Sequence, residues 1–111
     1  DFKRNYLHID DAVDAFLFAM ANSNLSGSCF NLGYSEANLS KRELCELIKK
    51  IIPEFVYFVS EIGEDIDKRN YIISNEKIES QGFKAKRSVE DGVRELIKVL
   101  PLIKRNQFAN I

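Results

Sequence analysis

Tryptophan is absent from this 111-residue sequence, and cysteine, histidine and proline are scarce. The two cysteines, Cys29 and Cys45, stand sixteen positions apart, and the single histidine, His8, is distant from both. This spacing is neither a zinc-ligand pattern nor a redox CxxC pair. We therefore expect two half-buried free thiols in a reducing, cytoplasmic environment, and no metal site.

Long apolar runs and an excess of one charge are also lacking. No apolar stretch approaches the roughly 20 residues that cross a bilayer, and no signal-peptide pattern is visible. Sixteen Lys and Arg residues face 17 Asp and Glu residues, so the net charge is −1 and no global field favours nucleic acid. The 45% hydrophobic and 30% charged residues are typical of one globular domain. We expect neither a membrane nor a nucleic acid as partner.

What the sequence does contain is clear helical signals. Ser40 with Glu43, and Ser88 with Asp91, have the spacing and residue types of capping boxes. Apolar side chains follow each pair at helical spacing until a proline ends the run. The sequence therefore predicts one amphipathic helix after each serine.

A third helix is expected over residues 12–21, with Asp10 or Asp11 as its cap. Its residues are apolar almost all round, which is typical of a helix buried on most of its faces. So short a chain offers little to cover it, which indicates a missing neighbour. A brief fourth helix is expected between Ser74 and Gly82.

The remaining segments predict a small sheet. Because helices separate the expected strands, their order favours parallel or mixed pairing with helical cover. The predicted fold class is α/β, a short sheet with covering helices. An exposed loop is expected at residues 61–68 and a tail at residues 102–111. Strands are expected at residues 5–9, 28–33 and 55–59, with a further extended piece at residues 71–73.

Two motifs carry a family resemblance. RNYLHIDD at residues 4–11 resembles a signature of the extended short-chain dehydrogenase/reductase family of nucleotide-sugar enzymes. DKRNYIISNEKI at residues 67–78, followed by SQGFKAKRSVEDGVREL, resembles the closing pattern of the same family. The resemblance implies the carboxy-terminal substrate-binding lobe of a Rossmann-type enzyme. Residues 1–101 would then form a nucleotide-sugar-binding subdomain, followed by the tail at residues 102–111.

Two elements of that family are absent from the sequence. It has no glycine-rich GxxGxxG turn, and no tyrosine is followed by lysine four residues later. The resemblance implies that NAD or NADP binds the full-length parent, through an amino-terminal Rossmann domain that this chain lacks. We therefore expect that this chain alone binds no cofactor and is inactive, and that the parent is an enzyme.

The resemblance also nominates site residues. It implies that Arg4 reaches the diphosphate of a nucleotide-sugar, a role for which a permanently charged guanidinium fork is suited. Arg69 is expected to close over the same diphosphate, although related epimerases often carry that arginine at the position of Glu64 here. Tyr6 alternates with Arg4 along the expected strand, so the two should share a face, with Tyr6 against the nucleotide. The alternatives are solvated arginines and a core tyrosine.

His8 is interpreted as structural rather than as a catalytic base, with a backbone group or a nearby carboxylate such as Asp11 as its expected partner.

The predicted function is that of the substrate-binding portion of an NAD(P)-dependent nucleotide-sugar epimerase/dehydratase. Two alternatives stay open, a keto-sugar nucleotide reductase of the same family and a non-catalytic interaction module derived from it. The expected partners are the nucleotide-sugar and the missing Rossmann domain, and a homodimer is possible.

Overall fold

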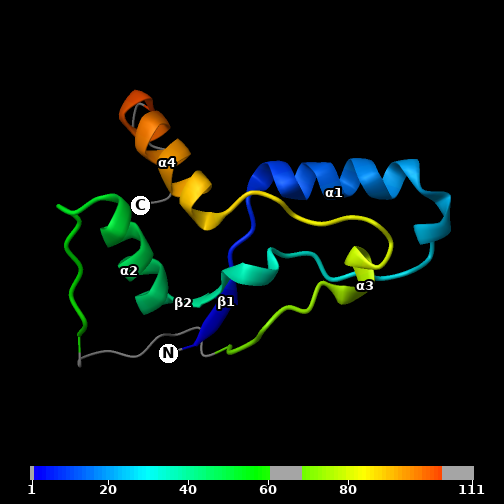
Figure 1. The fold of residues 1–111 in the computed structure, drawn as a ribbon, viewed down its shortest axis with the longest axis horizontal. Coiled ribbons are helices and arrows are strands. Elements are labelled where there is room, and N and C mark those ends of the chain that lie inside the picture. Colours follow the sequence, from blue (N-terminus) through cyan, green and yellow to red (C-terminus); the bar gives the residue numbers. More distant parts are fainter. Residues whose placement is uncertain (1, 61–68, 104–111) are drawn as a thin grey trace.

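The computed structural model describes residues 2–60 and 69–103. It contains short strands, four α-helices within these ranges and brief 3-10 turns, arranged along an elongated body (Figure 1). The strands are β1 (Lys3–Asn5) and β2 (Asn38–Ser40); the helices are α1 (Ile9–Ala21), α2 (Lys41–Ile51), α3 (Glu76–Glu79) and α4 (Val89–Val99); the 3-10 turns are η1 (Ser23–Leu25), η2 (Ser35–Ala37) and η3 (Leu100–Leu102).

The α/β class is confirmed in this coarse form, but the predicted pairing is wrong. β1 and β2 pair antiparallel, with Arg4 opposite Leu39. The side-chain amide of Asn5 accepts from the Tyr34 backbone N–H (3.0 Å) and donates to the Tyr34 carbonyl (2.8 Å). This contact holds residue 34, four positions before the start of β2, beside the end of β1.

The predicted strands also differ from those observed. The first covers residues 3–5 instead of 5–9, and β2 forms where a loop was expected. Residues 28–33 and 55–59 form no strand, because neither finds a backbone partner strand among the described residues. In the second of these segments Phe58 is 92% exposed, so its β-forming composition is not used in burial. Residues 71–73 are likewise not a regular strand.

The capping boxes at α2 and α4 are confirmed. At α2, Ser40 Oγ accepts from Glu43 N–H (3.2 Å) and Glu43 Oε2 accepts from Ser40 N–H (2.7 Å). Ser88 and Asp91 make the same reciprocal pair at α4 (3.1 and 3.0 Å). Each pair satisfies amides that a helix start leaves without partners.

Helix α1 begins earlier than expected and has a different cap. His8 Nδ1, not a carboxylate of Asp10 or Asp11, accepts from the Asp10 N–H (3.2 Å). Only Asp11 and Ala15 of this helix are buried, so the described residues do not provide the cover that its apolar composition predicts. The brief helix expected between Ser74 and Gly82 is α3. Gly82 follows it with a φ of +98°, a backbone conformation that favours glycine.

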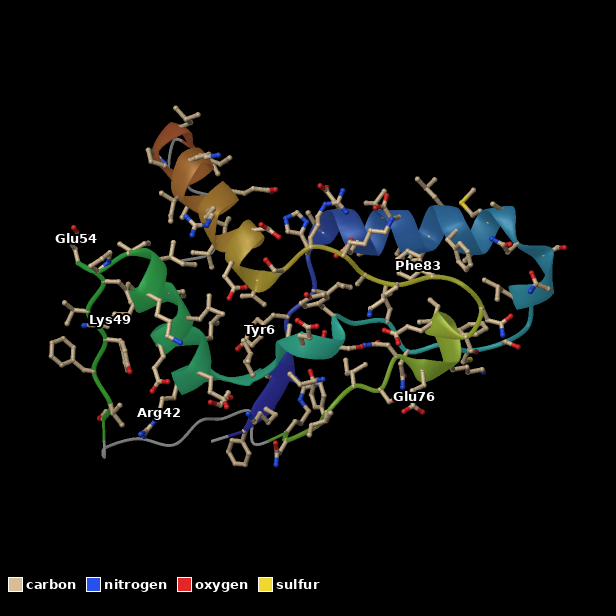
Figure 2. All side chains as sticks on the ribbon, in the orientation of Figure 1. Tyr6, Arg42, Lys49, Glu54, Glu76 and Phe83 are labelled. Atoms are coloured by element: carbon tan, nitrogen blue, oxygen red, sulfur yellow. The ribbon has the colours of Figure 1, made fainter. Side chains whose placement is uncertain are left out.

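Side-chain packing is concentrated between α1 and α3. Ala15 packs with Ile78 and Phe83, and the rings of Phe18 and Phe83 lie 5.6 Å apart. Phe83 is labelled in Figure 2. A second packing region joins α2 and α4 at the other end of the molecule. The loop predicted at residues 61–68 lies outside the described residues, as does the predicted tail from residue 104 onward.

Candidate functional site

The two sequence motifs meet at β1. The Lys3 N–H donates to Asn70 Oδ1 (2.8 Å), and the Tyr71 N–H donates to the Lys3 carbonyl at the long distance of 3.5 Å. Two residues on, the amide of Asn38 in β2 accepts from Ile73 N–H (3.0 Å) and donates to its carbonyl (3.3 Å). The segment that carries the second motif is therefore fixed beside both strands.

This arrangement positions Arg4, the first predicted phosphate ligand. Its guanidinium carbon lies 5.3 Å from the centroid of the Tyr71 ring, within cation–π range, and Nη1 donates to the Lys3 carbonyl (2.8 Å). The Arg4 side chain is half-buried. Arg69, the second predicted ligand, is exposed and lies two residues before Tyr71 in the adjoining segment.

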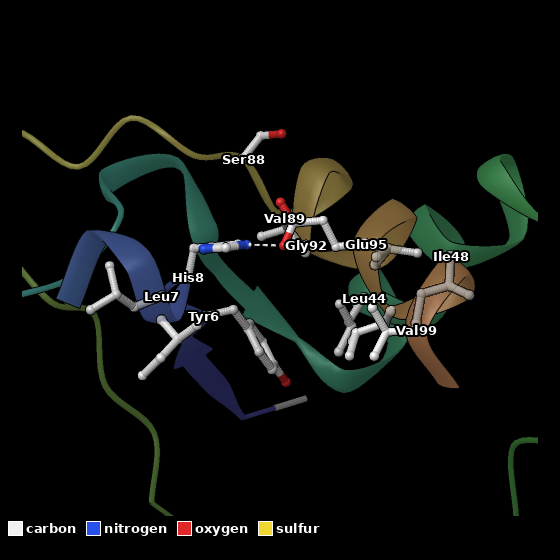
Figure 3. A pocket seen from close by; sticks show the side chains of 13 residues that line it. Tyr6, Leu7, His8, Leu44, Ile48, Ser88, Val89, Gly92, Glu95 and Val99 are labelled. Atoms are coloured by element: carbon white, nitrogen blue, oxygen red, sulfur yellow. Dashed lines mark hydrogen bonds and ion pairs between the residues drawn. The ribbon is translucent and has the colours of Figure 1, made fainter. Parts of the chain in front are cut away.

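Tyr6 lies in other surroundings than Arg4. It follows the end of β1, and its N–H donates to the Ala37 carbonyl (3.1 Å). The Tyr6 side chain lines an open cavity of about 430 Å³ that Arg4 does not line (Figure 3). The other walls are mostly apolar and come from residues 7–9, α2 and α4, including Leu44, Ile48 and Leu96.

His8 lies at the edge of this cavity. Because Nδ1 accepts the Asp10 N–H, the ring proton is on Nε2, which donates to Glu95 Oε2 (3.1 Å; dashed in Figure 3). The side chain is only 8% exposed, and a Cβ on Gly92 would lie 3.3 Å from its Cδ2. The expected kinds of partner, a backbone group and a carboxylate, are both found, but the carboxylate is that of Glu95 and not of Asp11. The contacts of His8 join the start of α1 to α4.

Sequence reasoning missed the polar junction around Asp11, a residue that is nearly inaccessible at 1% exposure. Asp11 Oδ2 accepts from the backbone N–H groups of Lys86 (3.1 Å) and Arg87 (2.8 Å), and Oδ1 accepts from Arg87 Nη1 (3.0 Å). Arg87 also contacts Asp14 (3.0 Å) and Asp10 (3.4 Å). Hydrogen bonds to Asp14 and Asp11 raise the pKa of Arg87. The only sequence signal was the second aspartate of the first motif.

A separate ion pair joins β1 to the start of α2. The Lys3 ammonium donates to Glu43 Oε2, the same oxygen that accepts from the Ser40 N–H. The hydrogen bond from Lys3, followed by that from the Ser40 backbone, lowers the pKa of Glu43 to about 2. This contact stabilises the carboxylate form of Glu43 and links β1 to the first turn of α2.

Other predicted features have simple outcomes. Both cysteines are free; Cys45 is half-buried as expected, whereas Cys29 is exposed. Within residues 2–60 and 69–103, no cluster of three or more His, Cys, Asp or Glu side chains could hold a metal ion. No helix in these ranges has the length and apolar character needed to cross a membrane.

Comparison with known proteins finds relatives that are similar to most of the chain. The chain is 33% identical over 105 residues to dTDP-D-glucose 4,6-dehydratase of Mus musculus. It is 29% identical over 96 residues to a probable GDP-L-fucose synthase 1 of Oryza sativa subsp. japonica. No family model matches the chain.

Both relatives are extended short-chain dehydrogenase/reductases, the family that the two motifs predicted, and the chain is similar to them over most of its length. Each match covers 86% of this chain but only 28% of the relative, so the chain spans little more than a quarter of the length of these proteins.

Proposed function

We propose that this chain is the substrate-binding portion of an NAD(P)-dependent nucleotide-sugar epimerase or dehydratase. In this role it binds the nucleotide diphosphate between β1 and the segment that begins at Arg69. The proposal rests on two contacts. Asn70 of that segment accepts a hydrogen bond from the Lys3 N–H, and the Arg4 guanidinium lies over the Tyr71 ring.

The physical chemistry of Arg4 suits a diphosphate. A guanidinium stays charged at all physiological pH values and meets phosphate oxygens through a planar fork of N–H donors. The Tyr71 ring and the Lys3 carbonyl restrain that fork, so less side-chain entropy is lost when an anion binds. Arg69 brings a second positive charge to the same segment. Binding the end of the substrate that does not react would position the sugar ring.

The names of the two relatives support the substrate class. One is named for GDP-L-fucose and the other for dTDP-D-glucose, which differ in base and sugar but share a diphosphate joining a nucleoside to a hexose. A site that reads the diphosphate serves both. The relatives carry out different conversions, so the proposed reaction stays at the level of the family, and a reductase remains the second form of the parent.

The described residues do not fit NAD(P) itself. Gly27, Gly33, Gly82 and Gly92 lie on separate turns and segments and form no phosphate-binding turn. The first turn of α1 carries the exposed Asp10 and the buried Asp11, whose carboxylates would repel a pyrophosphate. The cofactor and the proton-transfer groups would therefore come from the rest of a longer parent, in an amino-terminal Rossmann domain for which this chain forms the second lobe.

The test is the substitution Arg4→Ala in the longer parent enzyme. We expect KM for the nucleotide-sugar to rise by one to two orders of magnitude, since a charge-assisted phosphate contact contributes about 1.5–3 kcal/mol. Arg69→Ala should raise KM in the same direction. Arg94→Ala, at an exposed position on α4, is the matched control and should leave KM unchanged. An unchanged KM for Arg4→Ala, with folding verified by circular dichroism, would exclude the diphosphate role.

A further inference from the structure

One side of α1 is an apolar surface without cover among the described residues. We call it the outer face of α1; its members are Ile9, Val13, Phe16, Leu17 and Met20. Their spacing of four, three, one and three residues puts them on one stripe of a helix. Phe16 is 70% exposed and Met20 82% exposed. In Figure 1, α1 lies along an edge of the molecule with no other element drawn beyond it.

The chemistry of this face restricts what can cover it. From Ala15 to Ala21 the helix has no charged residue, and the three aspartates nearer its start all contact Arg87. Nothing on the last two turns would attract a charged or strongly polar partner. The occupant must itself present an uncharged apolar surface there.

The outer face continues into the cavity described above. Ile9 belongs to the face and also lines the cavity, whose opposite wall includes Leu96 and Val99 of α4. Both of these α4 side chains are exposed. The outer face and the cavity thus form one apolar surface running from α1 towards α4.

The chain contains too little core to account for this surface by itself. Among the described residues only six hydrophobic side chains are buried, and half of these are alanines. The radius of gyration is 16.8 Å, whereas a compact domain of this length has a radius of about 13 Å. The elements are laid out as if against a larger body.

Two occupants compete, a second copy of the chain and the rest of a longer polypeptide. The stripe from Ile9 to Met20 is about 17 Å long at 1.5 Å per residue. One such helix pair falls short of the roughly 1,200–2,000 Å² that a stable interface buries, and association also costs translational entropy. A covalently continuous segment does not bear that cost, and the chain spans only 28% of each relative.

We propose that the outer face of α1 and the adjoining cavity are covered by the cofactor-binding part of the same, longer polypeptide. The inference rests on the proposed function, because it requires a parent enzyme. Beyond the proposed function, it identifies the surface that contacts the rest of that enzyme. This contact is apolar and lies within one polypeptide.

The test is thiol labelling of Met20→Cys, made in a Cys29→Ser, Cys45→Ser background, with a maleimide probe. We expect rapid labelling in the 111-residue chain. In the longer polypeptide, labelling should be slower by at least about tenfold at every protein concentration, because it requires local opening. Glu54→Cys, at an exposed position of the loop after α2, is the control and should react at the same rate in both. Leu17→Cys provides a second reporter on the same face.

Equal reactivity of both reporters in the two chains would overturn the inference. Protection that appears in the 111-residue chain and increases with its concentration would identify a second copy as the occupant, and would overturn it as well. The result for Arg4→Ala is independent of these outcomes. Fast labelling with a raised KM refutes only the cover of α1, whereas protection with an unchanged KM refutes only the diphosphate role.

Discussion

The two sides of α1 are held in opposite ways. Its first turns are fixed by directional polar contacts, in which Asp11 is buried against the backbone of residues 86–87 and the side chain of Arg87. Its outer face carries five large apolar side chains that touch little of the described chain. The orientation of this helix is therefore specified within the chain, whereas most of its capacity for apolar burial is not used there.

The largest loss of unfolding free energy is expected from Asp11→Ala, which removes the polar contacts at the first turns of α1. The substitution would leave two buried backbone N–H groups and part of a guanidinium without their acceptor, so we expect a loss of about 3 kcal/mol in unfolding free energy. Asp14 contacts the same Arg87 nitrogen at the same distance of 3.0 Å but is half-exposed. Asp14→Ala should cost less than about 0.5 kcal/mol. Urea unfolding of both variants measures the contrast, and equal losses would show that the junction is no stronger than a surface pair.

A smaller loss is expected from Gly33→Ala. A Cβ at this position would lie 2.5 Å from Asn5 Oδ1, which is already held by the Tyr34 N–H. Displacing that amide should cost about 1–3 kcal/mol, as in other overpacked sites. The same substitution made in an Asn5→Ala background should cost clearly less, because the obstructing atom is gone. An identical cost in both backgrounds would place the strain elsewhere.

The smallest expected effect is on the stability of the chain at acid pH. The pKa of Glu43 is lowered from 4.5 to about 2, so this contact contributes stability above pH 4.5 and loses it as the pH falls towards 2. Glu43→Gln should remove that part of the pH dependence while leaving the shape of the curve above pH 5 unchanged. Lys3→Met, which removes the main cause of the shift, should flatten the same interval. Thermal melting between pH 2 and pH 6 is the measurement, and an unaltered acid slope in both variants would contradict the pKa.

What could be predicted from the sequence was mainly local. Ser40 with Glu43 and Ser88 with Asp91 lie within one helical turn, so their residue types predicted the start of α2 and of α4. The pairing of β1 with β2 could not be predicted, because it depends on Asn5 binding a loop 29 residues away.

The same limit applies to the candidate site. The junction of Asp11 with Arg87 spans 76 residues and has no local signature. Arg4, Tyr6 and Arg69 were nominated by family resemblance, and their roles remain predictions. The structure adds the contact between Arg4 and Tyr71, and the placement of Tyr6 in a separate apolar cavity.

Asparagine side chains make backbone-like hydrogen bonds in and beside the small sheet. Asn5 pairs with both backbone groups of Tyr34, Asn38 does the same with Ile73, and Asn70 accepts from Lys3. Each amide side chain presents N–H donors beside a carbonyl acceptor, so it can pair with a backbone N–H and C=O much as a peptide group does. At the outer edge of β1 the backbone N–H and carbonyl of Lys3 are therefore already engaged, which disfavours the addition of a further strand to that edge.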